Sequence, residues 1–238
     1  MFLRIADFNI DFENYGTSVA KKIKDYVVEN FNGEIDYKTK NYGEEIEKEK
    51  LLYEKVYPIG YYEETITYRK FAEWLPNKSA FVFHSATVDV DGVGIAFAAH
   101  SGTGKTTHMN LWQDYLGDRM VIVNGDKPIV RFFDDEPEQP YAYGTPWNGK
   151  EHLGFNMRTC LKHICFIERN ETNYVEKLNK SDAIDRIFNQ VYMPKDPIAV
   201  MNTMNLIDRL LSCCNLWIIH CNMEPEAAEV AYNTIFKK

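Results

Sequence analysis

The chain of 238 residues is long enough for one large domain, or for one domain with a smaller companion, and it can bury a substantial core. Hydrophobic residues make up 45% and charged residues 26%, as in ordinary globular proteins, and the net charge of -8 argues against a surface that binds nucleic acid. The absence of a membrane-length apolar run, of paired cysteine spacing and of a secretory leader predicts a cytoplasmic protein with reduced thiols and no membrane contact.

Residues 1–78 differ in texture from the rest and predict a small mixed α/β subdomain, which could recognise a substrate or a partner. Alternation of apolar and polar residues indicates strands, and apolar residues on one helical face indicate helices. The predicted elements are a strand over residues 2–10, a helix over 18–31, a strand over 34–38, a charged solvated segment over 43–50 and a helix over 66–74.

Residues 79–238 predict a nucleotide-binding domain, with a mixed α/β sheet and flanking helices. The strand over 120–124 is apolar enough to be fully buried, and the next strand would be its antiparallel neighbour. The predicted strands cover residues 80–84, 87–90, 93–99, 120–124, 129–133, 163–168, 175–178 and 216–220. The predicted helices cover residues 109–116, 181–193 with Ser181 as N-cap, 196–213 and 224–236.

The strongest local signal is Ser-Gly-Thr-Gly-Lys-Thr-Thr, between an apolar strand and an amphipathic helix. This order is typical of a phosphate-binding loop, where glycines let backbone N–H groups turn toward phosphate oxygens and the helix directs its positive end at the same anion. Lys105 adds a full charge, and the Thr106 hydroxyl is placed to bind Mg²⁺. The usual pattern opens with glycine where this chain has Ala99. The residues predicted to bind the nucleotide here are Ser101, Gly102, Thr103, Gly104, Lys105, Thr106 and Thr107.

Two further residues are candidates for the same site. Mg²⁺ prefers carboxylate oxygens, and Asp126 directly follows an apolar strand, which is where nucleotide enzymes place such a ligand. We therefore predict metal binding or catalysis for Asp126, against the alternative of an ordinary turn aspartate. His84 ends another predicted strand and suits either a structural or a catalytic role.

The run from His84 to Thr106 resembles the catalytic core of the HPr kinase/phosphorylase family. Members of that family have a histidine, then Val-Asp, Gly-x-Gly and a loop of the Ser-Gly-x-Gly-Lys-Ser type, at the spacing found here and without a gap. The loop is also similar to that of ATP-dependent phosphoenolpyruvate carboxykinases, which share the nucleotide-binding fold, and of small bacterial HPr-kinase-like proteins, some of which phosphorylate serine on peptides. The resemblance is strong over residues 84–130, weaker over 140–238 and absent over 1–75.

The resemblance implies a core of the phosphoenolpyruvate carboxykinase and HPr kinase type, with His84 in the active site. It also implies ATP and Mg²⁺ as cofactors. The family has two aspartates after the next strand, one for Mg²⁺ and one as general base, whereas this chain has Gly125 and Asp126. Asp126 can then do only one of these tasks. Either His84 takes the proton, or the chemistry is slow, or the chain only binds nucleotide.

A loop with Thr145, Pro146 and Gly149 carries Lys150, and Arg158 follows it. Because phosphoryl transfer depends on positioning and charge neutralisation, a second cation near the γ-phosphate is useful. Similar family members also have a Gly-Lys loop after a Thr-Pro turn at this place. We predict that Lys150 and Arg158 contact phosphate or substrate; the alternative for the lysine is an exposed turn position.

Three functions follow from these observations. The first is an ATP- and Mg²⁺-dependent kinase that phosphorylates a hydroxyl, with serine of a protein or peptide as the acceptor. In it His84, Asp126 and Lys105 are catalytic, and Thr106 and Asp126 hold Mg²⁺. The second is a nucleotide-binding sensor or partner-binding module without catalysis, and the third is a small-molecule kinase. The expected partners are a nucleotide and a protein or peptide substrate, and a homo-oligomer is compatible with the sequence.

Overall fold

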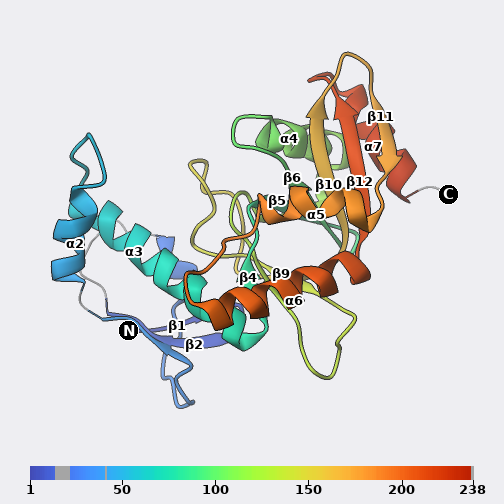
Figure 1. Ribbon diagram of the computed structural model, residues 1–238. Helices are drawn as coiled ribbons and strands as arrows, with labels where there is room; N and C mark the ends of the chain where they lie inside the picture. Colours follow the sequence, from blue (N-terminus) through green and yellow to red (C-terminus); the bar gives the residue numbers. More distant parts are fainter. Residues whose placement is uncertain (14–21, 41, 237–238) are drawn as a thin grey trace.

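The computed structural model describes residues 1–13, 22–40 and 42–236, which form two sheets with flanking helices (Figure 1). This confirms the predicted mixed α/β class. A small sheet of three strands, in the order β1-β2-β3, belongs to the N-terminal part, and a sheet of nine strands contains the rest. Within the described ranges, no helix is both long and apolar enough to cross a membrane.

Two of the N-terminal elements differ from the predicted ones, whereas the helix predicted over 66–74 forms the second part of α3 and the strand predicted over 34–38 contains β3. Residues 2–10, predicted as one strand, form two, because Ala6 and Asp7 take positive φ angles of 52° and 59° and turn the chain back on itself. Of the helix predicted over 18–31, residues 18–21 lie outside the described part. Lys22 is helical, a 3-10 turn follows at Lys24–Tyr26, and residues 27–31 are not helical. The elements are β1 (Phe2–Ile5), β2 (Phe8–Asp11), η1 (Lys24–Tyr26), β3 (Tyr37–Lys38), α2 (Gly43–Lys50), α3 (Ile59–Trp74) and η2 (Leu75–Lys78).

The larger sheet is organised around β10 (Arg158–Arg169). Its first residues pair antiparallel with β9, and its later residues lie parallel to both β6 and β12. Because β6 and β10 are parallel, their carboxyl ends meet at one edge of the sheet. The other strands are β4 (Ala80–Val82), β5 (Ser85–Val90), β6 (Val93–Ala98), β7 (Met120–Asn124), β8 (Ile129–Arg131), β9 (Tyr141–Tyr143), β11 (Tyr174–Lys177) and β12 (Asn215–Cys221).

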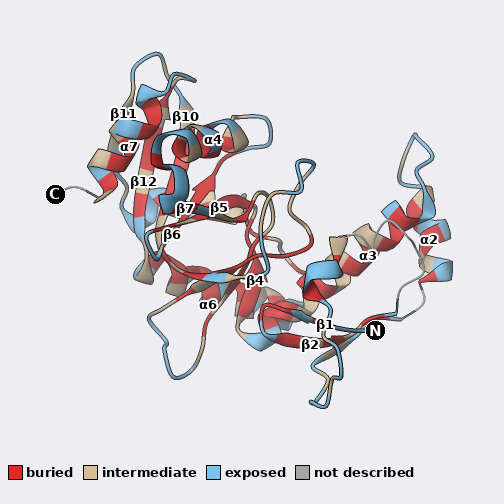
Figure 2. Cartoon of the chain, turned by 180° about the vertical axis from the view of Figure 1, so that it is seen from behind, coloured by how far each residue is buried: buried red, intermediate tan, exposed pale blue. Residues whose placement is uncertain are grey.

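Helices cover both faces of this sheet, which explains the unbroken apolar run in β6. Ile95 and Phe97 face the cluster that contains α4 and α7, whereas Ala96 and Ala98 face the cluster that contains α5 and α6. Figure 2 shows the resulting burial of the central strands. The helices, with one 3-10 turn, are α4 (Lys105–Leu116), η3 (Gly117–Arg119), α5 (Lys180–Phe188), α6 (Pro197–Cys213) and α7 (Glu226–Phe236).

Three details of the predicted second domain were wrong. β7 ends one path of the sheet and leaves Val121 36% exposed, so it is not fully buried. β8 pairs with β4 and β9 instead of β7, because the turn after Asn124 leads the chain to another part of the sheet. The N-cap of α5 is Asn179, whose side chain accepts a hydrogen bond from the Asp182 backbone N–H, and not Ser181.

The N-terminal region packs directly on the larger sheet. One apolar cluster includes Phe8 of the small sheet, Phe71 of α3, Val82 of β4 and Ile129 of β8. The boundary predicted near residue 78 falls between η2 and β4, and this cluster extends across it. Whether the two parts are separate domains stays a prediction.

Candidate phosphate-binding cleft

The Gly-rich loop leaves β6 at Ala98 and enters α4 at Lys105, so the strand and helix predicted on either side of it are present. Gly102 and Gly104 have φ angles of +80° and +126°, and a Cβ at either position would meet no atom within 4 Å. Glycine is thus required here by the backbone angle and not by crowding. The first N–H groups of α4 lack partners inside the helix and are available to an anion.

Ala99, which replaces the usual first glycine, does not adopt a left-handed conformation, so the chain needs no glycine there. Its carbonyl accepts hydrogen bonds from Lys105 Nζ at 2.9 Å and from the Gln190 side-chain nitrogen at 3.1 Å. Lys105 is only 8% exposed. Burial lowers the pKa of its ammonium group, while the negative charge of Asp126 opposes that shift.

Arg169, at the end of β10, holds the loop from the side. Its Nε donates to the Thr103 carbonyl at 2.9 Å, and its Nη2 donates to the Gly102 carbonyl at 2.6 Å. Because C=O and N–H of one peptide unit point in opposite directions, the Gly104 N–H points away from Arg169. Gly104 lines the cleft described below, so this arrangement favours an N–H that faces a ligand.

Asp126 follows β7, and its carboxylate pairs with the imidazole of His84 and the ammonium group of Lys127. Its Oδ1 lies 3.2 Å from His84 Nε2, and its Oδ2 lies 2.6 Å from Lys127 Nζ. Burial raises the pKa of this carboxyl group, but the hydrogen bonds to His84 and Lys127 outweigh burial and lower the pKa to about 2. Asp126 is therefore ionised at neutral pH.

A turn around the buried side chain of Asn124 fixes the backbone of Asp126. The Asn124 Oδ1 accepts from the backbone N–H groups of Asp126 and Lys127 at 2.9 Å and 2.7 Å, and the Asn124 Nδ2 donates to Thr145 Oγ1 at 3.0 Å. Such a side-chain-to-backbone turn is a common use of asparagine. It joins the end of β7 to the loop around Thr145.

Gly125 leaves little room for the second carboxylate that the family resemblance implies. A Cβ at this position would lie 3.1 Å from the Asn148 carbonyl oxygen and 3.3 Å from the Leu153 carbonyl oxygen. The Gly125 N–H also donates to Leu153 O at 2.9 Å. A side chain here would have to push back the loop over residues 148–153, so the chain has one aspartate in this turn.

His84 is held from both sides. Its Nε2 faces Asp126, and its Nδ1 accepts from the Gln190 side-chain nitrogen at 3.1 Å. The Gln190 amide takes this orientation because the reverse would place its oxygen against the carbonyl oxygens of His84 and Ala99. Nδ1 accepts a hydrogen bond, so Nε2 carries the proton and donates to Asp126.

These elements surround one cleft. The predicted site residues that line it are His84, Ser101, Gly102, Gly104, Lys105, Thr106, Thr107, Asp126 and Lys150. Thr103 lines a neighbouring hollow together with His100, Glu168 and Arg169. Arg158 is not among the residues that line the cleft; its Nη1 instead donates to Tyr143 Oη at 3.0 Å and to Asp7 Oδ2 at 3.2 Å.

Sequence reasoning missed several residues of the cleft. Lys127 directly follows Asp126 and could have been suspected from that adjacency alone. Lys22 and Glu64 come from distant parts of the chain and gave no local signal. The same is true of Gln190, which lines the neighbouring hollow and bonds to His84. Glu151 follows Lys150 in the loop over residues 144–153, which is the second loop of the cleft, and its carboxylate borders the same space beside Gly149 as Asp126. Glu151 Oε2 and Asp126 Cγ lie 3.7 Å and 3.8 Å from the position that a Cβ would take at Gly149.

The oxygen donors in the cleft fit Mg²⁺ better than a softer metal. Thr106 and Asp126 offer a hydroxyl and an ionised carboxylate, and Mg²⁺ commonly uses one or two carboxylates together with phosphate oxygens and water. Across the described residues, no group of three or more His, Cys, Asp or Glu side chains could hold a metal without a ligand's help. A cation at Asp126 would compete with Lys127 for Oδ2.

No family model matches the chain, and no curated protein matches its sequence. Among solved structures, the HPr(Ser) kinase/phosphatase from Coxiella burnetii is similar to it, with 9% identity and a TM-score of 0.35. The match covers 66% of this chain and 97% of that chain. A similarity at this score does not establish a shared family, so the function is inferred from the residues of this chain.

Proposed function

We propose that the chain is an ATP- and Mg²⁺-dependent phosphotransferase that transfers the γ-phosphoryl group to a hydroxyl, with serine of a protein or peptide as the acceptor. One observation carries the proposal: the Gly-rich loop with Lys105, the His84–Asp126 pair and Lys150 line the same cleft. A core of the phosphoenolpyruvate carboxykinase and HPr kinase type is part of this proposal.

The anionic nucleotide would bind to positive groups on both sides of the cleft. On one side, Lys105 and the start of α4 supply a charge and free backbone N–H groups. On the other side, Lys127 and the exposed Lys150 lie along the same hollow. Together these cations would offset the charge of the triphosphate, which is the main requirement for phosphoryl transfer.

Thr106 and Asp126 would hold Mg²⁺, which when bound neutralises charge on the β- and γ-phosphates. His84 is then a positioning residue, because its Nε2 proton is directed at Asp126 and its Nδ1 is occupied by Gln190. Among the described lining residues, the other carboxylates are Glu64, which pairs with Lys22, and the exposed Glu151. We assign the acceptor hydroxyl's proton to Glu151, because a second carboxylate at Gly125 would crowd the loop over residues 148–153 and Glu151 is the described lining carboxylate without an assigned partner.

The test is transfer of label from γ-labelled ATP to serine peptides and to proteins of a cell extract, with Mg²⁺ present. We expect labelled phosphoserine with the natural chain and label transfer about 1000-fold slower with Lys105→Met. Crowding at Gly125 favours the alternative of a nucleotide-binding module without catalysis. Nucleotide bound in calorimetry but no label on any acceptor would establish that alternative and overturn the proposal.

A further inference from the structure

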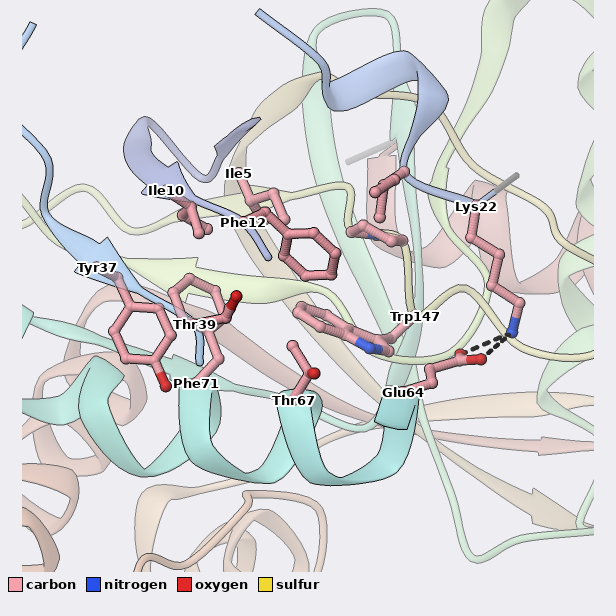
Figure 3. A pocket seen from close by; sticks show the side chains of 12 residues that line it. Ile5, Ile10, Phe12, Lys22, Tyr37, Thr39, Glu64, Thr67, Phe71 and Trp147 are labelled. Atoms are coloured by element: carbon pink, nitrogen blue, oxygen red, sulfur yellow. Dashed lines mark hydrogen bonds and ion pairs between the residues drawn. The ribbon is translucent and has the colours of Figure 1, made fainter. Parts of the chain in front are cut away.

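A second cavity lies beside the cleft, between the small N-terminal sheet, α3 and the loop that carries Trp147 (Figure 3). Its surface is almost wholly apolar. The hydroxyl-bearing Thr67 forms part of the α3 wall, and Figure 3 shows it on the opposite side of the Trp147 ring from Phe12. The apolar walls include Ile5, Ile10, Phe12 and Phe71.

The cavity adjoins the cleft through shared residues. Lys22, Glu64 and Trp147 line both hollows. Lys22 Nζ and Glu64 Oε1 form an ion pair at 2.7 Å, with side chains 29% and 20% exposed, so the pair stands where the two hollows meet. A ligand held in the cleft by its reacting hydroxyl could therefore extend a neighbouring group into the cavity.

Trp147 is held in place from two directions. Its backbone N–H donates to Thr145 Oγ1 at 3.2 Å, and Thr145 is bonded in turn to Asn124 beside Asp126. Its ring lies 5.4 Å from the Tyr68 ring and 5.9 Å from the Phe71 ring, both on α3. Hydrogen bonds thus connect the cavity wall at Trp147 to the turn that carries Asp126, and they fix the distance between the two.

The chemistry and size of the cavity restrict what it can bind. Its free volume is about 20 Å³, which suits one or two methyl-sized groups and neither a ring nor a lipid chain. A water molecule there would need two to four polar partners, which an apolar wall does not supply. Sugars, with a hydroxyl on nearly every carbon, are poor ligands for the same reason.

We infer that this cavity binds a small aliphatic side chain, of the size of alanine or valine, next to the serine that receives the phosphoryl group. The inference rests on the proposed phosphotransferase function and adds a substrate class to it: peptides with a small apolar residue adjacent to the acceptor serine. The Lys22–Glu64 pair lies where the two hollows meet, so the peptide backbone would stay in the cleft and its small side chain would pass this pair.

The inference is tested with the full chain, labelled ATP, Mg²⁺ and peptides Gly-Gly-X-Ser-Gly-Gly and Gly-Gly-Ser-X-Gly-Gly, where X is Gly, Ala, Val, Phe or Asp. We expect Val or Ala in one register to raise the rate at least about 10-fold over Gly, because each buried methyl-sized group contributes a several-fold gain. Phe and Asp should give no gain. Equal rates for Gly, Val and Asp would overturn the inference and leave the proposed function standing.

Thr67→Leu, which fills the cavity, should reduce the Val peptide to the rate of the Gly peptide. Thr65→Leu is the matched control, since Thr65 lies on the same helix outside the cavity and donates its hydroxyl to Tyr61 O. Thermal unfolding by circular dichroism checks that both variants fold. If Thr67→Leu does not fold, Ile10→Ala provides the reverse test: an enlarged cavity should admit the Phe peptide, and unchanged Phe discrimination would overturn the inference.

Absence of label on every peptide would contradict the proposed function without deciding the cavity's role. Calorimetry with the same peptides, in the presence of a non-hydrolysable ATP analogue, then decides it. Tighter binding of the Val peptide than of the Gly peptide, lost in Thr67→Leu and kept in Thr65→Leu, supports the cavity as a side-chain site. Equal binding of the two peptides overturns it.

Discussion

The two loops that form the cleft both depend on glycine, but glycines in them meet different surroundings. Gly102 and Gly104 of the first loop have positive φ angles and open space around them. Gly144 of the second loop is crowded, since a Cβ there would lie 1.8 Å from the Phe155 carbonyl oxygen and 2.7 Å from the Val123 carbonyl oxygen. The first loop thus keeps its backbone accessible to a ligand, whereas the second packs closely against the end of β7.

Because of this difference, substitutions in the two loops should have different effects on nucleotide binding and on the stability of the fold. Substitutions in the first loop should affect the nucleotide more than the fold, because few protein atoms contact its glycines. Substitutions at the crowded glycines of the second loop should affect the fold first, because neighbouring backbone cannot move away easily.

The largest effect is expected for Lys105→Met, which removes the charge at the start of α4 and keeps the apolar stem. Loss of one preorganised charge in a site of this kind reduces the rate about 1000-fold. Stability should be unchanged or higher, because burial already disfavours the charged ammonium group, whose pKa is lowered. Label transfer and thermal unfolding measure the two quantities.

Lys150→Met is the control for that prediction, because Lys150 is an exposed cation on the second loop of the same cleft. Its loss should reduce transfer by less than about 10-fold, in line with the weak energies of exposed charges. A rate for Lys105→Met within 10-fold of the natural chain would show that the first loop does not bind the transferred phosphate.

Gly144→Ala should give the largest loss of stability. Its Cβ would collide with two backbone carbonyls, and overpacking of this kind costs about 3 kcal/mol. For a chain of this size, that corresponds to a drop in unfolding temperature of about 6 to 12 °C. Circular dichroism during heating is the measurement. An unfolding temperature within 2 °C of the natural chain would mean that the second loop is not packed against β7 as described.

Asp126 lines the same cleft as the two loops, and its ionisation should be visible in the acid stability of the chain. Its folded-state pKa of about 2 lies below the ordinary pKa of an aspartate, 3.8, so its contribution to stability is present above pH 4 and is lost as the pH falls toward 2. A shift of this size corresponds to about 2 kcal/mol. Urea unfolding between pH 5 and pH 2 measures it.

Asp126→Asn should remove this part of the pH dependence, whereas Asp118→Asn, in the exposed turn after α4, should keep it. An acid profile that is the same for Asp126→Asn and the natural chain would contradict the hydrogen bonds assigned to His84 and Lys127.

The contrast between the loops also explains what the sequence could predict. The strand before Ser101, the helix after it and the alternation of Ile95 and Phe97 are local patterns, and the structure contains them. Asp126 could be suspected because an apolar strand precedes it. The pairing of β8 with β4 and β9 has no local pattern in the sequence, so the sequence wrongly predicted that β8 pairs with β7.

Arg158 and Gln190 also show that distance along the chain is a poor guide to the residues of the site. Arg158 follows the second loop in sequence but bonds to Asp7, 151 positions away, and does not line the cleft. Gln190 is distant in sequence from every predicted site residue, yet it bonds to His84 and Ala99. Proximity along the chain therefore predicted Arg158 for the site and gave no reason to predict Gln190. The contacts of Gln190 depend on how α5 packs beside the sheet, which is not a local property of the sequence.

Gly102→Ala should give the smallest change in stability and the clearest separation of binding from folding. Alanine at a φ of +80° costs about 1 kcal/mol of backbone strain, and its Cβ would meet no atom within 4 Å. Gly92→Ala is a closely matched control, because Gly92 has a φ of +87° and equally open surroundings in the β5–β6 turn, away from the cleft. Both variants should therefore unfold at nearly the same temperature.

Only Gly102→Ala should weaken nucleotide binding, by about 5-fold or more, since a side chain there stands where phosphate oxygens would approach the backbone. Equal nucleotide affinities for the two variants, measured by calorimetry, would mean that the open backbone around Gly102 serves the turn alone and that the phosphate binds elsewhere in the cleft.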